Sequence, residues 1–226
     1  MVTPNLRLSG RYGALLFALF ALFTTTACKE QPRSYSTSTA GARVIFQDDF
    51  NRGILGKDWL TTGSGVTLDR GRLRLADLKN HPIWLRRELP DNVRIEFDAW
   101  AETEEGDIKV ELAGDGTSYA QSASYTASGY VVIFGGWDNS VHVLARQNEH
   151  GDDRIAVPAD PKVEPDRRYR IAITRHGGEL RFEVDGELIA ELVDEDPLIG
   201  PGHQHFAFNN WEAPTRFDNL VIYALE

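Results

Sequence analysis

Three acidic residues, Glu96, Asp98 and Glu102, follow one another along a stretch of alternating polarity and could supply paired carboxylates. Paired carboxylates hydrolyse glycosidic bonds when their carboxyl groups lie about 5 Å apart for retention, or about 6.5–9.5 Å apart for inversion. A strand rises about 3.3 Å per residue, so Glu96 and Glu102 would stand about 20 Å apart unless a bulge shortened the gap. We therefore expect no catalytic residue here, and interpret these carboxylates as solvent-facing charges or groups that hydrogen-bond a sugar.

Histidines offer a second candidate chemistry, because His203 and His205 could bind a metal with His150, Asp152 or Asp153. Their spacing is not specific to any metal, and the sequence has no HExxH motif. We interpret them as hydrogen-bonding histidines in a loop, and predict no metal ligand and no cofactor.

Aromatic and polar side chains point instead to ligand binding. Sugars are bound by flat aromatic rings that stack on C–H faces, and by amides, carboxylates and guanidinium groups that meet hydroxyls. Trp100, Trp137 and Trp211 each stand among polar neighbours. The other two tryptophans, Trp59 and Trp84, are interpreted as core residues. The candidate ligand-binding residues are Glu96, Asp98, Trp100, Trp137, His142, Arg146, Asn148, His150, Asn209 and Trp211.

Several of these candidates fall in the stretch 130–150, which is typical of a β-hairpin. An apolar run leads into the turn residues Gly-Gly-Trp-Asp-Asn-Ser, and a second apolar pattern follows. Alternation places Val143 and Ala145 on one face of the second strand, and His142, Arg146 and Asn148 on the other. We interpret the polar face as one wall of a ligand groove.

The elements that would position these residues are short strands. Segments of alternating polarity recur from Val44 onward, and Asp185-Gly186 between two of them is a strong hairpin signal. No segment longer than about ten residues has a convincing helical period. The sequence predicts one all-β sandwich or barrel domain over 44–226. The expected strands are Val44–Phe46, Gly71–Ala76, Ile83–Leu89, Val93–Trp100, Asp107–Leu112, Tyr169–Thr174, Glu179–Asp185, Glu187–Leu192, His205–Asn209 and Phe217–Leu225, besides the hairpin.

The first 27 residues have the parts of a secretory signal, with two arginines, an apolar run and small residues before Cys28. The stretch resembles a bacterial lipoprotein signal, which implies that Cys28 is acylated and anchors the chain in a membrane; an ordinary cleaved signal is the alternative. By resemblance to Gram-negative sorting, Lys29 favours the outer membrane. Residues 28–43 are rich in Ser, Thr and Ala and are expected to form a flexible tether.

Composition excludes several classes of function. The net charge is −10, and removal of residues 1–27 takes away two arginines and no acidic residue, which leaves −12. No basic run is present, so nucleic acid is not expected as a partner. The sequence also lacks GxSxG, GxxxxGK[ST] and GxGxxG, the motifs of hydrolase nucleophiles and nucleotide loops.

The segments DDFNRGILGKDW, GRLRL, RIEFDAW, YRIAITRHGGELRFE, VDGELIAEL and FDNLVIY together resemble a concanavalin A-like lectin/glucanase domain. The resemblance covers 44–226 and implies an antiparallel two-sheet jelly-roll sandwich; members related to sugars, such as the 3-keto-disaccharide hydrolase group, look most similar. Laminarinase-type members carry Glu-x-Asp-x-x-Glu, which Glu96, Asp98 and Glu102 exceed by one residue. Some members hold a structural calcium near the chain ends, where Asp49 and Asp218 fall here.

The leading hypothesis is a membrane-anchored lipoprotein whose jelly-roll domain binds an envelope or environmental glycan without catalysis. A glycan-active enzyme, either a glycoside hydrolase or a lyase, is the first alternative. A structural or protein-interaction module of the cell envelope is the second. The sequence favours none of the oligomeric states.

Overall fold

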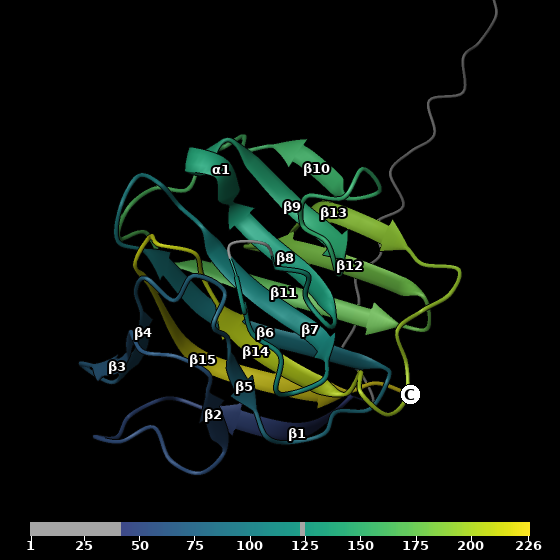
Figure 1. Cartoon of the computed structure of the whole chain (residues 1–226), viewed down its shortest axis with the longest axis horizontal. Coiled ribbons are helices and arrows are strands. Elements are labelled where there is room, and N and C mark those ends of the chain that lie inside the picture. The colour runs from purple at the N-terminus through teal and green to yellow at the C-terminus, as the bar shows by residue number, and fades with distance from the viewer. Residues whose placement is uncertain (1–41, 123–124) are drawn as a thin grey trace, which may run out of the picture. The chain divides into compact units, whose positions relative to one another are not determined.

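A computed structural model describes residues 42–122 and 125–226 (Figure 1). The proposed signal peptide, Cys28 and all but the last two residues of the 28–43 tether lie outside the described residues. No helix in the described part of the chain is long and apolar enough to cross a membrane.

Two antiparallel sheets face each other (Figure 1). The larger, eight-stranded sheet has β1 paired with β15, so that an early strand of the domain lies beside the last one. Its order is β13 (Glu187–Val193), β12 (Glu179–Val184), β11 (Tyr169–His176), β6 (Val93–Ala101), β15 (Thr215–Ala224), β4 (Arg72–Leu75) and β3 (Val66–Asp69), with β1 (Arg43–Asp48) off this path.

The second sheet is seven-stranded, with β7 at its centre. Its order is β10 (Ile155–Pro158), β9 (Val141–Arg146), β8 (Tyr130–Gly135), β7 (Ile108–Gly114), β14 (His205–Asn209), β5 (Ile83–Leu85) and β2 (Trp59–Thr61). A single helical turn, α1 (Gly136–Asn139), joins β8 to β9. The architecture confirms the predicted all-β, two-sheet jelly-roll sandwich.

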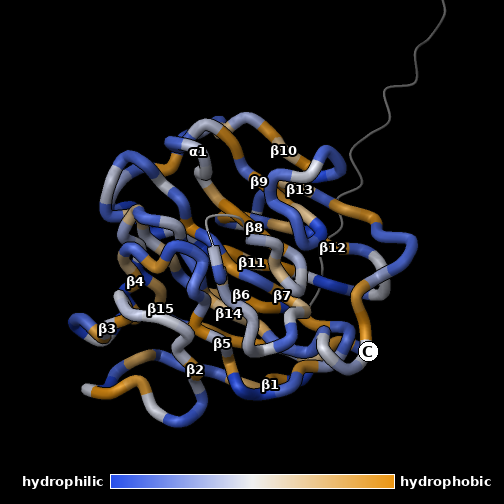
Figure 2. Tube along the Cα trace, in the orientation of Figure 1, coloured by the Kyte–Doolittle hydropathy of each residue, from blue (hydrophilic) through white to orange (hydrophobic). Residues whose placement is uncertain are grey.

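The apolar core lies between the two sheets, and alternate residues of each strand enter it. On β6 the core residues are Val93, Ile95, Phe97 and Ala99, as the alternation predicts. Figure 2 shows apolar residues gathered along the strands and polar residues in many of the connections. This core fixes which face of each strand is turned outward.

A second, smaller apolar cluster covers part of the outer face of the seven-stranded sheet. Val131 and Ile133 of β8 pack there with Val143 and Ala145 of β9, beneath Ala127. Strand β8 is therefore apolar on both of its faces.

Candidate functional site

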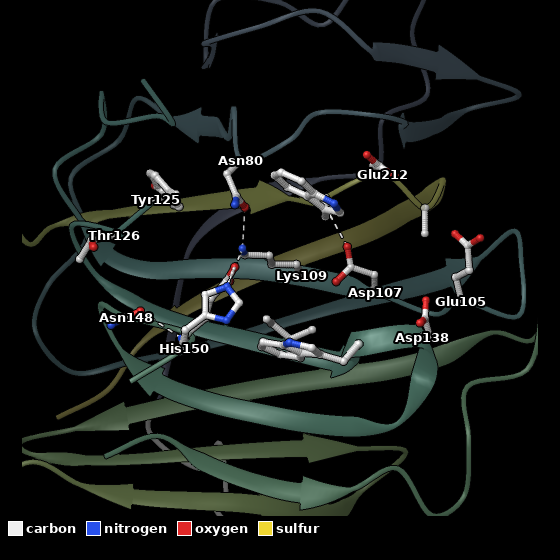
Figure 3. A pocket seen from close by; sticks show the side chains of 15 residues that line it. Asn80, Glu105, Asp107, Lys109, Tyr125, Thr126, Asp138, Asn148, His150 and Glu212 are labelled. Carbon is white, nitrogen blue, oxygen red and sulfur yellow. Dashed lines mark hydrogen bonds and ion pairs between the residues drawn. The ribbon is translucent and has the colours of Figure 1, made fainter. Parts of the chain in front are cut away.

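A cavity of about 800 Å³ opens on the outer face of the seven-stranded sheet (Figure 3). Lys109 of β7 and Ile133 of β8 lie at its floor, and connections between strands form its walls. The register explains the position, because Ile108 pairs with Phe134 and Lys109 pairs with Asn209. The ends of β8 and β14 thus flank the start of β7 on either side.

The connections that leave these two strands each bring a tryptophan to the cavity. Trp137 lies in α1 after β8, and Trp211 follows β14, so the two come from opposite sides of β7. Both are unusually exposed for tryptophan, at 38% and 42%. Exposed rings beside a polar floor can stack on the apolar face of a ligand.

The turn that carries Trp137 has left-handed backbone geometry, with φ of 49° at Trp137, 54° at Asp138 and 57° at Asn139. Such angles are costly outside glycine and need support from their surroundings. Buried Asn139 supplies it, since its side-chain amide donates to the carbonyl oxygens of Glu104 (2.9 Å) and Val163 (2.7 Å) and its Oδ1 accepts from Val163 N (2.9 Å).

Two further contacts hold the Trp137 side chain. The His150 ring meets it edge-on at a centroid distance of 5.3 Å, and the Arg154 guanidinium lies 4.9 Å from its centroid. The Trp211 backbone is held instead, because its N–H donates to Asp107 Oδ2 at 2.8 Å and its carbonyl accepts from Lys79 N at 2.8 Å.

The floor contains a buried ion pair. Lys109 is 1% exposed, and its Nζ donates to Asn80 Oδ1 at 2.6 Å and to Glu149 Oε2. Asn209 Nδ2 also reaches Asn80 Oδ1, at 3.3 Å, and donates to Glu111 Oε1 at 2.8 Å. The desolvation of such a pair can cost as much as its attraction returns, so the pair is weak evidence for a purely stabilising role.

Burial strongly perturbs the carboxyl groups near this floor. It raises the pKa of Asp107 to about 6 and that of Glu111 to about 7, although the charge of Lys109 opposes both shifts. Tyr125 Oη donates to Glu111 Oε2 at 3.0 Å, and burial together with that carboxylate raises the pKa of Tyr125. Perturbed groups in a cavity are typical of functional sites.

The structure brings five of the ten candidate residues together. Trp137, Asn148, His150 and Trp211 line the cavity, and Asn209 lies beneath it, bonded to Asn80 and Glu111. Asn148 Oδ1 accepts from His150 N at 3.0 Å, which links two of these residues directly.

Glu96, Asp98 and Trp100 lie elsewhere, on the outer face of the eight-stranded sheet. Burial raises the pKa of Glu96, but hydrogen bonds from Arg94 and Arg170 outweigh it and lower that pKa overall. Trp100 is buried, with a guanidinium 4.1 Å from its ring centroid. These three predicted ligand-binding residues therefore lie apart from the cavity, which is a first correction to the candidate set.

Asp98 and Glu102 are also held by partners on that sheet. Asp98 accepts from Asn219 Nδ2 at 2.9 Å, while Glu102 receives Arg74 at 2.8 Å and Arg216 at 2.6 Å. Paired in this way, these carboxylates reinforce contacts between strands.

His142 and Arg146 need a second correction, because they face away from the cavity. His142 stacks on Phe134 at 4.5 Å, its Nδ1 accepts from Gly135 N at 3.0 Å, and burial lowers its pKa. Arg146 Nε donates to Asp194 Oδ2 at 2.9 Å. The polar face of β9 thus meets the core. The apolar face with Val143 points outward and packs in the smaller apolar cluster with Ala127.

The histidines considered as metal ligands bind backbone carbonyls. His203 Nδ1 lies 3.2 Å from Ala113 O, and His205 Nδ1 lies 2.9 Å from Leu85 O. Across residues 42–122 and 125–226, no group of three or more His, Cys, Asp and Glu is placed to hold a metal ion.

Sequence reasoning missed Asn80, Asp107, Lys109 and Glu149. A signal for two of them existed, because the alternation in DIKVEL places Asp107, Lys109 and Glu111 on one face of a strand whose other face is apolar. Asn80 and Glu149 lie in connections, where periodicity carries no information.

Comparison with known proteins supports the fold. No protein-family model matches the sequence, and no curated protein matches it. Carbohydrate-binding module CBM66 from Bacillus subtilis is 12% identical with a TM-score of 0.58, over 74% of this chain and 96% of that one. A Bacillus subtilis protein with a galectin-like fold is 14% identical with a TM-score of 0.56, over 81% and 97%.

The laminarinase catalytic domain from Thermotoga maritima MSB8 is 12% identical with a TM-score of 0.55, over 82% of this chain and 99% of that one. At these identities the matches show the jelly-roll fold alone. The resemblance to the 3-keto-disaccharide hydrolase group stays a prediction.

Proposed function

We propose that the cavity on the seven-stranded sheet binds a carbohydrate of the cell envelope or the environment, without catalysis. The observation that carries this proposal is the pair of exposed tryptophans on opposite sides of β7, above a floor of fixed hydrogen-bonding groups. Rings that stack on sugar faces, combined with charged and amide groups that meet hydroxyls, are the elements of carbohydrate recognition. A volume of about 800 Å³ suits a short oligosaccharide.

The solved structures of this fold add support from analogy. They include a carbohydrate-binding module and laminarinases, so the same fold is found both in a binding protein and in enzymes. Fold alone does not select a function, so the proposal rests on the cavity.

Glycan-array binding of the wild type and three variants tests the proposal. Trp137→Ala and Trp211→Ala should each weaken binding by about tenfold or more, because each removes one stacking surface. Trp100→Phe is the matched control, since it changes a tryptophan on the other sheet and should leave affinity unchanged. If the wild type binds no glycan and co-purifies with envelope proteins, the protein-interaction alternative replaces this proposal.

A glycoside hydrolase or lyase is the second candidate, and Asp107 is the observation that favours it. A carboxyl group whose pKa is about 6 can hold a proton near neutral pH, as a general acid must, and Glu149 lines the same cavity. Product release from a glycan panel that Asp107→Asn abolishes, with binding retained, would establish this candidate. Turnover unaffected by Asp107→Asn would remove Asp107 from that role.

We further propose that Cys28 is acylated and anchors the chain at the outer membrane. The support is the signal-like sequence of residues 1–27 and the position of the single cysteine directly after it. Cys28→Ser should move the protein to the soluble fraction and abolish incorporation of labelled palmitate. Unchanged membrane retention and labelling of the variant would refute the anchor.

A further inference from the structure

The side chains that line the cavity are predominantly acidic. Glu105, Asp107, Asp138, Glu149 and Glu212 contribute five carboxylates, against the single ammonium group of Lys109. His150 adds an imidazole. The carboxylates do not define the site, which the cavity and its two tryptophans establish independently. They set the charge that a ligand meets there.

Ion pairs neutralise only part of this charge. Lys109 is committed to Glu149, and the exposed Lys79 lies 3.5 Å from Glu212. Within the described residues, no basic side chain forms an ion pair within 4.0 Å with Glu105 or Asp138. Figure 3 shows these two carboxylates on the same side of the cavity. The lining therefore keeps a net negative charge at the end of the cavity where these two carboxylates lie.

The two exposed tryptophan rings also favour a positively charged ligand. The face of an indole ring attracts cations, and an Arg154 guanidinium already lies 4.9 Å from the Trp137 centroid. Among the described residues no protein cation occupies the corresponding position over the exposed ring of Trp211. That ring is left for a ligand.

We infer that the ligand is a glycan with protonated amino groups, such as one containing de-N-acetylated hexosamine units, and that uronate and sulfated glycans are rejected. This inference rests on the proposed function, carbohydrate binding in this cavity. An ammonium group on the sugar gains attraction from Glu105 and Asp138 and can stack against Trp211. A carboxylate or sulfate on the sugar would meet the same side chains with repulsion.

Calorimetric titration of the full-length protein with three trisaccharides tests the charge rule. The probes are triglucosamine, its fully N-acetylated form and trigalacturonate, each at low and at high sodium chloride. Triglucosamine should bind about tenfold more tightly than the N-acetylated trimer, trigalacturonate should bind most weakly, and salt should narrow the differences.

Two variants locate the cause. Glu105→Gln with Asp138→Asn should bring the affinity for triglucosamine towards that for the N-acetylated trimer. Glu187→Gln with Glu195→Gln makes the same change in net charge at exposed positions outside the cavity, and should keep the preference.

The outcomes separate this inference from the proposed function. Equal binding of the three probes, tighter binding of trigalacturonate, or a preference untouched by the Glu105/Asp138 variant overturns the charge rule and leaves carbohydrate binding standing. Binding of none of the probes, together with a blank glycan array, overturns both.

Discussion

Glu111 illustrates how a single buried carboxyl group links this site to pH. Its side chain is fully buried, and Tyr125 Oη and Asn209 Nδ2 donate to it. Two donors favour the charged form, yet burial outweighs them and raises its pKa to about 7. The folded protein therefore holds a proton on Glu111 that the unfolded chain releases at a lower pH.

The free energy of unfolding should fall as pH rises between about 4.5 and about 7, because the folded state binds the extra proton in that window. The shift in the pKa of Glu111 should lower the free energy of unfolding by on the order of 3 kcal/mol over this pH range. Urea unfolding of wild type and Glu111→Gln at several pH values measures it, and the variant should have the shallower dependence.

Two other carboxyl groups limit the pH range in which this prediction is specific to Glu111. Asp107 adds a slope of the same sign up to about pH 6, so the Glu111→Gln difference between pH 6 and 7 is the most specific. Hydrogen bonds from Arg74 and Arg216 lower the pKa of Glu102. Protonation of Glu102 therefore reduces stability only when the pH falls below the usual pKa of a glutamate. Parallel curves for wild type and Glu111→Gln across the window would contradict the assignment.

At the scale of elements, the turn between β8 and β9 is the support on which Trp137 depends. Asn139 makes three hydrogen bonds there with backbone groups of the connections around Glu104 and Val163. Asn139→Ala should lower the free energy of unfolding by about 2–3 kcal/mol, because it leaves buried backbone groups without partners. It should also weaken any binding that requires Trp137.

Ser140→Ala is the matched control for that prediction. Its exposed hydroxyl donates to Trp137 O at 2.6 Å, so the loss should stay below about 1 kcal/mol. Chemical denaturation and glycan titration of both variants give the comparison. Equal losses in the two variants would mean that the buried side chain of Asn139 does not fix this turn.

The same hairpin shows where prediction from sequence ends. On β6, polar residues alternate with apolar ones, so the alternation alone assigns Val93, Ile95 and Phe97 to the core. On β9 the face with His142 and Arg146 is turned inward, while the apolar face with Val143 packs in the outer cluster, so the rule that polar residues face outward selects the wrong face. The prediction that His142 faces a ligand is wrong for this reason.

Candidate site residues divide in a similar way. Trp137 and Trp211 could be selected because they stand in polar turns, where a tryptophan has little core to enter. Asn80 could not be selected, because two backbone hydrogen bonds bring it to the floor of the cavity. Lys79 N donates to Trp211 O, and Ala120 N donates to Asn80 O. These are tertiary contacts between segments far apart in the sequence.

At the scale of the whole molecule, the two outer faces of the sandwich differ in how they use charge. On the eight-stranded sheet, Arg94 bridges Glu96 at 2.7 Å and Glu183 at 2.6 Å, and Arg170 reaches Glu96 at 2.9 Å. On the seven-stranded sheet, Glu105 and Asp138 of the cavity have no ion-pair partner among the residues that the structure describes. A face with compensated charges braces its strands, whereas the uncompensated carboxylates of the other face are those that the proposed binding of a cationic glycan uses.

Among the described residues, 42–226 supply two complete sheets with a shared core, and β1 pairs with β15 to tie the start of this region to its end. We therefore expect a chain beginning at residue 42 to fold without the preceding residues. It should unfold in one cooperative transition and bind the same glycan with the affinity of the full-length protein. Circular dichroism during thermal unfolding and calorimetric titration of both proteins measure this. Loss of the transition would show that earlier residues are needed for folding, and a folded fragment with weakened affinity would show that they contribute to the site.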